Sequence, residues 1–118
     1  MVAEVGLKLR RVTTLLEGLA SSPDLSRFKE LIEPLEAHDR EHNSDLVHTL
    51  RIFFAANANV SETADRLFLH RNSVPYRLER IGELTGLDLK DHQVRLALQL
   101  GLLASSNERR KNDEVEHT

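Results

Sequence analysis

The chain has 118 residues, of which 40% are apolar and 30% charged, and it contains no cysteine. This length suffices for one compact domain with a single core, and the composition excludes both a disordered chain and a disulfide-stapled fold. No apolar run reaches the roughly 18 residues that a membrane helix needs, and the N-terminal segment has no continuous apolar stretch, so we expect a cytoplasmic protein without membrane contact.

The positive charge of the chain is concentrated in one segment. The formal net charge is −3, which taken alone argues against a polyanionic partner. Between His70 and Arg80, however, three arginines and one glutamate give a net +2, which leaves −5 for the remaining residues. This clustering favours a nucleic-acid contact in that segment.

The apolar residues recur at three- and four-residue spacing, and no segment shows the alternation typical of strands. The sequence therefore predicts an all-α bundle of five or six helices. A first helix is marked by leucines at positions 7, 15, 16 and 19. A second is expected from Leu25 to about His38, with Asp24 as its N-cap and Pro34 as a point where it kinks or divides. Asn43 or Ser44 is expected to cap a third helix, which ends at the turn 57–59.

The next two predicted helices form a closely spaced pair. A short helix opens at Ser61, with Ala64, Leu67 and Phe68 expected to point inward. After a tight turn, Asn72 or Ser73 caps a longer helix that Gly86 terminates, and Pro75 falls in its first turn, where a missing N–H costs nothing. Its buried side is expected to carry Val74, Leu78 and Ile81.

The last predicted helix runs from its cap at Asp91 to Leu102. The tail at 105–118 is polar and is expected to be disordered. The chain is thus divided into N-terminal helices at 1–40, a core unit at 41–104 and this tail.

The pair at 61–84 has the features of a helix-turn-helix reader: a short helix, a small residue at the crossing, and a longer helix whose outer N-terminal face is polar. Ala64 is the small residue. Arginine suits a guanine edge or a phosphate, and asparagine suits an adenine edge. The alternative is a helical bundle whose arginines form only a solvated face.

The segment from Ala56 to Leu102 resembles a known family. Its run HRNSVPYRLERI followed by LTGLDL is a long signature, and it resembles the C-terminal helix-turn-helix domain of the bacterial regulators related to the purine-catabolism activator and the sugar-diacid regulator (PucR/CdaR-like). The resemblance continues upstream through PLEAHDREHNSDLVHTLRIFF and, more loosely, to about Leu15. In that family this domain binds operator DNA through a pair of helices similar to the Fis-type reader, while a larger N-terminal region senses a metabolite.

The resemblance implies a sequence-specific transcriptional regulator whose partner is double-stranded DNA, with residues 72–85 as the recognition helix in the major groove. The effector would bind a region absent from this chain, which is either the C-terminal piece of a longer regulator or a stand-alone relative. The sequence departs from the family at Pro75, which removes one possible DNA contact, and at Phe68, where many such units have glycine. The implied DNA-binding residues are Thr63 and Arg71 beside the backbone, and Asn72, Ser73, Tyr76, Arg77 and Arg80 on the recognition helix.

Other constellations in the sequence are weaker. His38 and His42 are four residues apart with Asp39 between them, which resembles a zinc-protease helix, but no third ligand follows at a fixed spacing. No catalytic residues, metal site or cofactor are therefore expected, and the chain is not predicted to be an enzyme.

The rival hypothesis is an interaction module without DNA binding. In it, apolar residues of the N-terminal helices pair with a second chain, although they could equally belong to the chain's own core. The two hypotheses are compatible, because readers of this type act as dimers on paired half-sites, and we expect a homodimer. The residues concerned are Leu15, Leu16, Leu19, Phe28, Leu31, Ile32 and Leu35.

Overall fold

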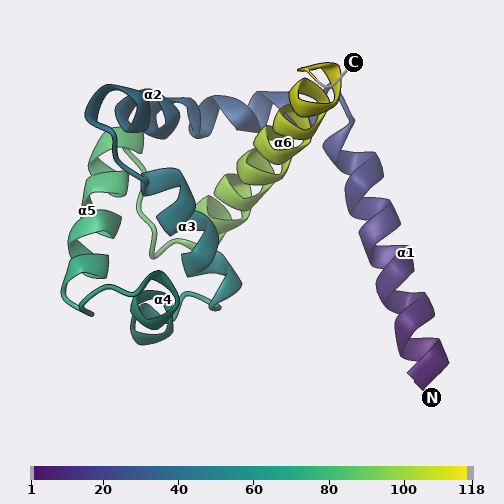
Figure 1. Ribbon diagram of the computed structural model, residues 1–118, viewed down its shortest axis with the longest axis horizontal. Helices are drawn as coiled ribbons and strands as arrows, with labels where there is room; N and C mark the ends of the chain where they lie inside the picture. The colour runs from purple at the N-terminus through teal and green to yellow at the C-terminus, as the bar shows by residue number, and fades with distance from the viewer. Residues whose placement is uncertain (1, 117–118) are drawn as a thin grey trace.

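The computed structural model describes residues 2–116, and side chains from 5 to 106. This part of the chain forms six α-helices and one 3₁₀ helix without a β-strand, which confirms the predicted all-α fold (Figure 1). None of these helices combines the length and apolarity needed to cross a membrane. The elements are α1 (Val2–Ala20), η1 (Leu25–Leu31), α2 (Glu33–His42), α3 (Leu46–Ala55), α4 (Val60–Leu67), α5 (Ser73–Thr85) and α6 (His92–Glu116).

One hydrophobic core joins most of these elements. Leu50 of α3, Ile81 of α5 and Leu98 of α6 are fully buried in it. Because α6 packs closely against η1, a side chain on Gly101 would not fit: its Cβ would lie 2.5 Å from the carbonyl oxygen of Phe28. The core cluster consists of Ile32, Leu35, Leu46, Leu50, Phe53, Ile81, Leu98 and Leu102.

The predicted second helix is in fact two elements. Residues Leu25–Leu31 form the 3₁₀ helix η1, and Asp24 precedes it without making a side-chain cap. A new α-helix, α2, begins at Glu33 with Pro34 in its first turn, where the absent N–H has no partner to lose. The expectation that Pro34 divides this region is confirmed.

The C-terminal tail does not form the disordered segment that its composition suggests. The last helix, α6, continues to Glu116, and Asp91 begins it by accepting a hydrogen bond from the Gln93 N–H at 2.8 Å. Ser105 is buried, and the Ser106 hydroxyl accepts a hydrogen bond of 2.6 Å from Arg51. The prediction of disorder from residue 105 is therefore wrong for residues 105–116, and residues 117–118 lie outside the described part. Lysine, arginine and glutamate are good helix formers, so a polar composition does not prevent a helix from continuing.

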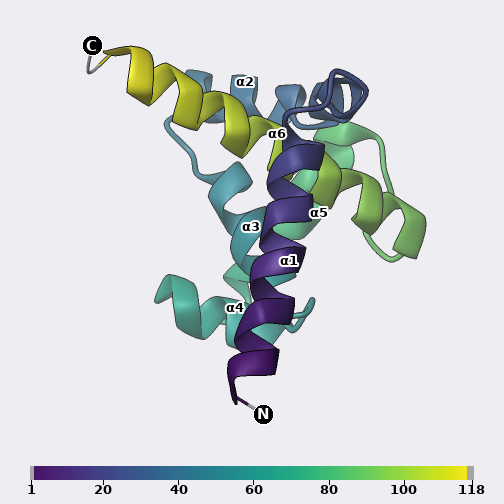
Figure 2. The ribbon, with the colours of Figure 1, turned by 90° about the vertical axis from the view of Figure 1, so that its right-hand side faces the viewer.

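The first helix stands apart from this body. Figure 1 shows α1 projecting away from the other helices, with its C-terminal end near η1 and α6, and in Figure 2 the same helix lies toward the viewer, in front of the body. Its large apolar side chains are exposed, from Val5 to Leu19. By contrast, Ile32 and Leu35, which the rival hypothesis offered to a second chain, lie in the chain's own core.

Candidate nucleic-acid interface

The helices α4 and α5 form a helix-turn-helix unit. Asn59 is the N-cap residue of α4, directly before the first helical residue. Its side chain accepts a hydrogen bond of 2.9 Å from the Glu62 N–H. Ala64 is only 2% exposed, and its carbonyl accepts a hydrogen bond of 2.9 Å from the Leu69 N–H, which closes the turn. The predicted role of Ala64 as the small residue in this unit is confirmed by its burial.

Phe68 takes an unexpected conformation in the turn. It is the C-cap residue of α4 and has φ 56°, in the left-handed region where glycine is most easily accommodated. Its side chain points outward and is 95% exposed. The prediction that Phe68 points inward is therefore wrong, and closing the turn without glycine costs roughly 1 kcal/mol of backbone strain.

The two faces of α5 differ as predicted. Val74 and Ile81 are fully buried and hold the helix to the body. On the other side, Tyr76 is 72% exposed, and Asn72 and Arg80 are also exposed. The outer face of the first turns of α5 therefore offers amide, phenol and guanidinium groups to a ligand.

The start of α5 is held by the turn rather than by a side-chain cap. Asn72 occupies the N-cap position, but its side chain makes no capping hydrogen bond. Instead, the carbonyl oxygen of His70 accepts a hydrogen bond from the Ser73 N–H at 2.9 Å, and the His70 ring accepts one from the Asn72 N–H at 3.2 Å. The Asn72 amide is therefore left available for an external partner.

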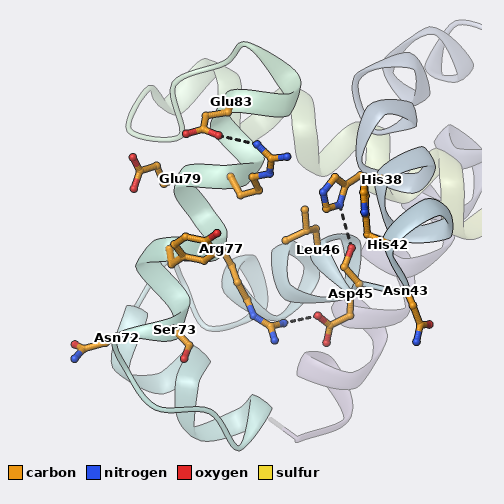
Figure 3. Close-up of a pocket in the computed structure, with 13 residues that line it drawn as sticks. His38, His42, Asn43, Asp45, Leu46, Asn72, Ser73, Arg77, Glu79 and Glu83 are labelled. Carbon is orange, nitrogen blue, oxygen red and sulfur yellow. Dashed lines mark hydrogen bonds and ion pairs between the residues drawn. The ribbon is translucent and has the colours of Figure 1, made fainter.

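Arg77 serves a different purpose from the other polar residues of α5. Its guanidinium is only partly exposed and donates a hydrogen bond to the Asp45 carboxylate (Figure 3). It donates a second hydrogen bond of 3.0 Å to the Thr49 hydroxyl. Both partners lie at the start of α3, and Thr49 is fully buried. Arg77 thus holds α5 against α3, and its side chain lies at the margin of the polar face of α5 and is engaged within the chain.

A carboxylate from α2 fixes the start of α3, to which Arg77 is bound. The side chain of Asp39 accepts hydrogen bonds from the N–H groups of Leu46 at 2.8 Å and Val47 at 3.0 Å, and from the Ser44 hydroxyl at 2.6 Å. The expectation that Asn43 or Ser44 caps α3 is wrong, because Asp39, six residues before Asp45, satisfies the free N–H groups. A chain of polar contacts therefore runs from α2 through α3 to α5.

The two residues predicted to lie beside the DNA backbone have different surroundings. Thr63 is fully buried, and its hydroxyl donates a hydrogen bond of 2.6 Å to the Asn59 carbonyl inside α4. It has no exposed surface to offer a phosphate, so its assignment is corrected to a packing role. Arg71, in contrast, is exposed in the turn before α5.

The local positive charge is partly neutralised in the folded chain. The Arg80 guanidinium lies 3.0 Å from the Glu83 carboxylate on the exposed surface of α5, and Arg77 is paired with Asp45. Of the three arginines in the segment 70–80, Arg71 has no carboxylate partner among the described residues. Exposed ion pairs of this kind are weak, so a phosphate can compete for Arg80.

An open groove of about 1140 Å³ lies along this face (Figure 3). Tyr76 and Arg80 line one side of it, and the end of α2 contributes His42 and Asn43 to the other. From the sequence, His42 was considered only as part of a weak metal motif and Asn43 only as a possible helix cap, so neither was associated with this site. No sequence signal links them to α5, because the groove arises from the packing of α2 beside α5.

His38 and His42 lie together at the end of α2, but no third potential metal ligand joins them among the residues whose side chains are described. The rings of His38 and His42 lie 4.4 Å apart, and Nδ1 of His38 is 3.1 Å from the Ser44 hydroxyl.

A short helix, a tight turn and a longer helix with a polar outer face, set in an all-α bundle, define a helix-turn-helix domain. Residues 46–104 match the family described as the PucR C-terminal helix-turn-helix domain. The chain belongs to this family, as the resemblance of its sequence implied.

Three characterised proteins illustrate the relationship. The chain is 39% identical to the purine catabolism regulatory protein of Bacillus subtilis (strain 168), over 67% of this chain and 15% of that protein. It is 43% identical to the carbohydrate diacid regulator of Escherichia coli (strain K12), over 62% of this chain and 19% of the relative. It is 38% identical to the proline-responsive transcriptional activator PutR of Bacillus subtilis (strain 168), over 58% of this chain and 17% of that protein.

The matched segment thus makes up less than a fifth of each of these three relatives. No solved structure shows a significant match to the chain.

Proposed function

We propose that this chain is the DNA-binding domain of a transcriptional regulator and that α5 enters the major groove. The observation that carries the proposal is the free face of α5. Val74 and Ile81 anchor the helix, whereas Asn72, Tyr76 and Arg80 point away from the body in a domain of this family. All three relatives described above are named as regulators or activators, which supports the same function.

The chemistry of this face suggests a division of roles. Asn72 and Tyr76 would contact base edges or sugars, because an amide can pair with adenine through a donor and an acceptor. Arg71 and Arg80 would contact phosphates, and Ser73 lies at the helix N-terminus, where free N–H groups and the helix dipole favour an anion. Arg77 and Thr63 are assigned to holding the unit together rather than to contacting DNA.

Two copies acting on paired half-sites would fit this class of reader, because one recognition helix covers only a few base pairs. We therefore propose a homodimer on double-stranded DNA. A chain that pairs with itself and binds no DNA remains the second candidate, and the exposed apolar side chains of α1 favour keeping it.

The test starts from a pool of random duplexes, from which the chain selects its preferred sequence. Affinities for the selected duplex and for an unselected one are then measured at several salt concentrations. Arg80→Ala should weaken binding to both duplexes and reduce the salt slope by about one. Asn72→Ala should cost roughly 1–3 kcal/mol on the selected duplex and little on the other.

Arg27→Ala is the matched control, because Arg27 is an exposed arginine on η1, which packs against α1, α2 and α6 rather than α5. It should leave the affinity for both duplexes nearly unchanged. If the folded wild-type chain binds neither duplex even at low salt, or if Arg27→Ala weakens binding as much as Arg80→Ala, the assignment of α5 to DNA is wrong.

A further inference from the structure

A single apolar stripe runs along α1. The side chains of Val5, Leu9, Val12, Leu16 and Leu19 follow one another at intervals of four, three, four and three residues. This is the spacing of the a and d positions in a two-stranded coiled coil, in which such a stripe meets a second helix of the same kind. All five side chains are exposed, from 67% at Val5 to 41% at Leu19.

The helix α1 has little else to stabilise it. It contains two interior glycines, Gly6 and Gly18, and neither has a neighbouring group within 4 Å of where a Cβ would lie. Glycine is among the least favourable residues inside a helix, and the β-branched Val12 and Thr13 add little helix propensity. Since most helical stability comes from packing of an apolar face, α1 needs a partner for its stripe.

We propose that this partner is a second copy of the chain, and that the two α1 helices form a parallel coiled coil. In that pairing Val5, Val12 and Leu19 occupy d positions, and Leu9 and Leu16 occupy a positions. Leucine at a with β-branched residues at d also suits three or four strands, so sedimentation as a trimer or tetramer would overturn the two-stranded pairing. The self-matching spacing is what identifies a second copy, since the same stripe supplies both sides of the seam.

The charges beside the stripe are compatible with an identical partner. In a parallel pair the g position of one helix faces the next e position of the other, so Lys8 would face Thr13, and Leu15 would face Ala20. No like charges meet, and the second contact adds apolar surface. Arg10, Arg11 and Glu17 fall at outer positions of the heptad, away from the seam.

The parallel orientation rests on the proposed function, because it puts both bodies at the same end of the coiled coil, where two α5 helices can reach one duplex. The pairing itself does not depend on DNA. Five side chains on a helix of this length bury less than the roughly 800 Å² per partner of a standard interface. We therefore expect a weak dimer, with a dissociation constant on the order of tens of micromolar.

The test of pairing is sedimentation equilibrium of the whole chain in the absence of DNA, with two matched variants. Leu9 lies in the stripe and Leu7 outside it, yet they are 65% and 63% exposed on the same helix. Leu9→Glu should raise the dissociation constant at least tenfold, and Leu7→Glu should change it less than twofold. Both variants should keep the thermal unfolding temperature of the body, which shows that they fold.

A wild-type chain that remains monomeric at several hundred micromolar would overturn the proposal and would mean that something other than a second copy covers the stripe. Equal effects of the two variants would overturn it as well. Because the experiment contains no DNA, a failure of pairing and a failure of DNA binding are seen separately.

The orientation is tested by disulfide cross-linking, which the absence of native cysteine makes unambiguous. In a parallel pair, Val5→Cys places two thiols across the seam, so mild oxidation should give a covalent dimer. Leu7→Cys, on the outer side, should give far less. If Val5→Cys cross-links only when mixed with Leu16→Cys, the helices are antiparallel and the proposed orientation is wrong.

Discussion

The body of the protein and its first helix use the same apolar residue types in opposite ways. In the body, Leu50, Ile81 and Leu98 are completely buried and join helices from distant parts of the chain. On α1, Leu7, Leu9 and neighbouring apolar residues are half to two-thirds exposed. The difference shows that three- and four-residue spacing predicts an amphipathic helix, but it does not reveal whether the surface that covers it lies in the same chain.

The body and α1 should differ most in how much stability is lost when a leucine is replaced by alanine. Leu50→Ala removes a fully buried side chain from the core and should lower the free energy of unfolding by about 3 kcal/mol. Leu7→Ala, made on the exposed outer side of α1, should change it by less than about 0.5 kcal/mol. Urea denaturation of both variants checks this. Equal losses would mean that α1 unfolds as part of the body rather than independently of it.

The same substitution at two helical glycines should have opposite effects. Gly101→Ala pushes a Cβ against the Phe28 carbonyl oxygen and to 2.9 Å from Ile32 Cγ1, so it should destabilise the body by about 2 kcal/mol. Gly18→Ala meets nothing within 4 Å and should increase the helical content of α1.

Thermal denaturation and far-ultraviolet circular dichroism measure these two effects. An unchanged melting temperature for Gly101→Ala would show that η1 and α6 do not approach as closely as the structure indicates. A loss of helicity in Gly18→Ala would show that α1 is packed against something at that position.

A smaller effect should separate the two arginines of α5. Arg77→Ala breaks the contacts with Asp45 and Thr49 and should cost about 1 kcal/mol of stability. Arg80→Ala loses only an exposed pair with Glu83 and should cost less than about 0.5 kcal/mol. Chemical denaturation of the two variants compares them, and a larger loss for Arg80 would contradict the fastening role of Arg77.

Much of the fold could be predicted from the sequence because local signals agree with tertiary packing. Pro34, Asp91 and Gly86 each mark a helix boundary where a backbone rule applies, and the buried side of α5 follows directly from helical periodicity. The 3₁₀ form of η1 could not be predicted, because no local signal in its sequence distinguishes it from an α-helix. The continuation of α6 past residue 105 was not predicted. A polar segment can extend a helix whose preceding residues are already held in place by burial, and its composition alone does not show this.

The site was harder to predict than the fold. Helical angles correctly gave Asn72, Tyr76 and Arg80 a common exposed side, but they place Arg77 only at its margin and cannot show that Asp45, thirty-two residues earlier, binds it. The burial of Thr63 and the outward position of Phe68 likewise depend on how the turn closes in three dimensions. Which of the exposed residues contact DNA stays a prediction.

If the outer face of α5 binds DNA and α1 does not, titration with the duplex selected from the random pool should change the amide chemical shifts of the whole chain most at residues 69–80, around the turn and the first turns of α5. Little change is expected from Val5 to Leu15. Changes concentrated on α1 or η1, with residues 69–80 unaffected by a duplex that binds, would contradict the assignment of α5 to DNA.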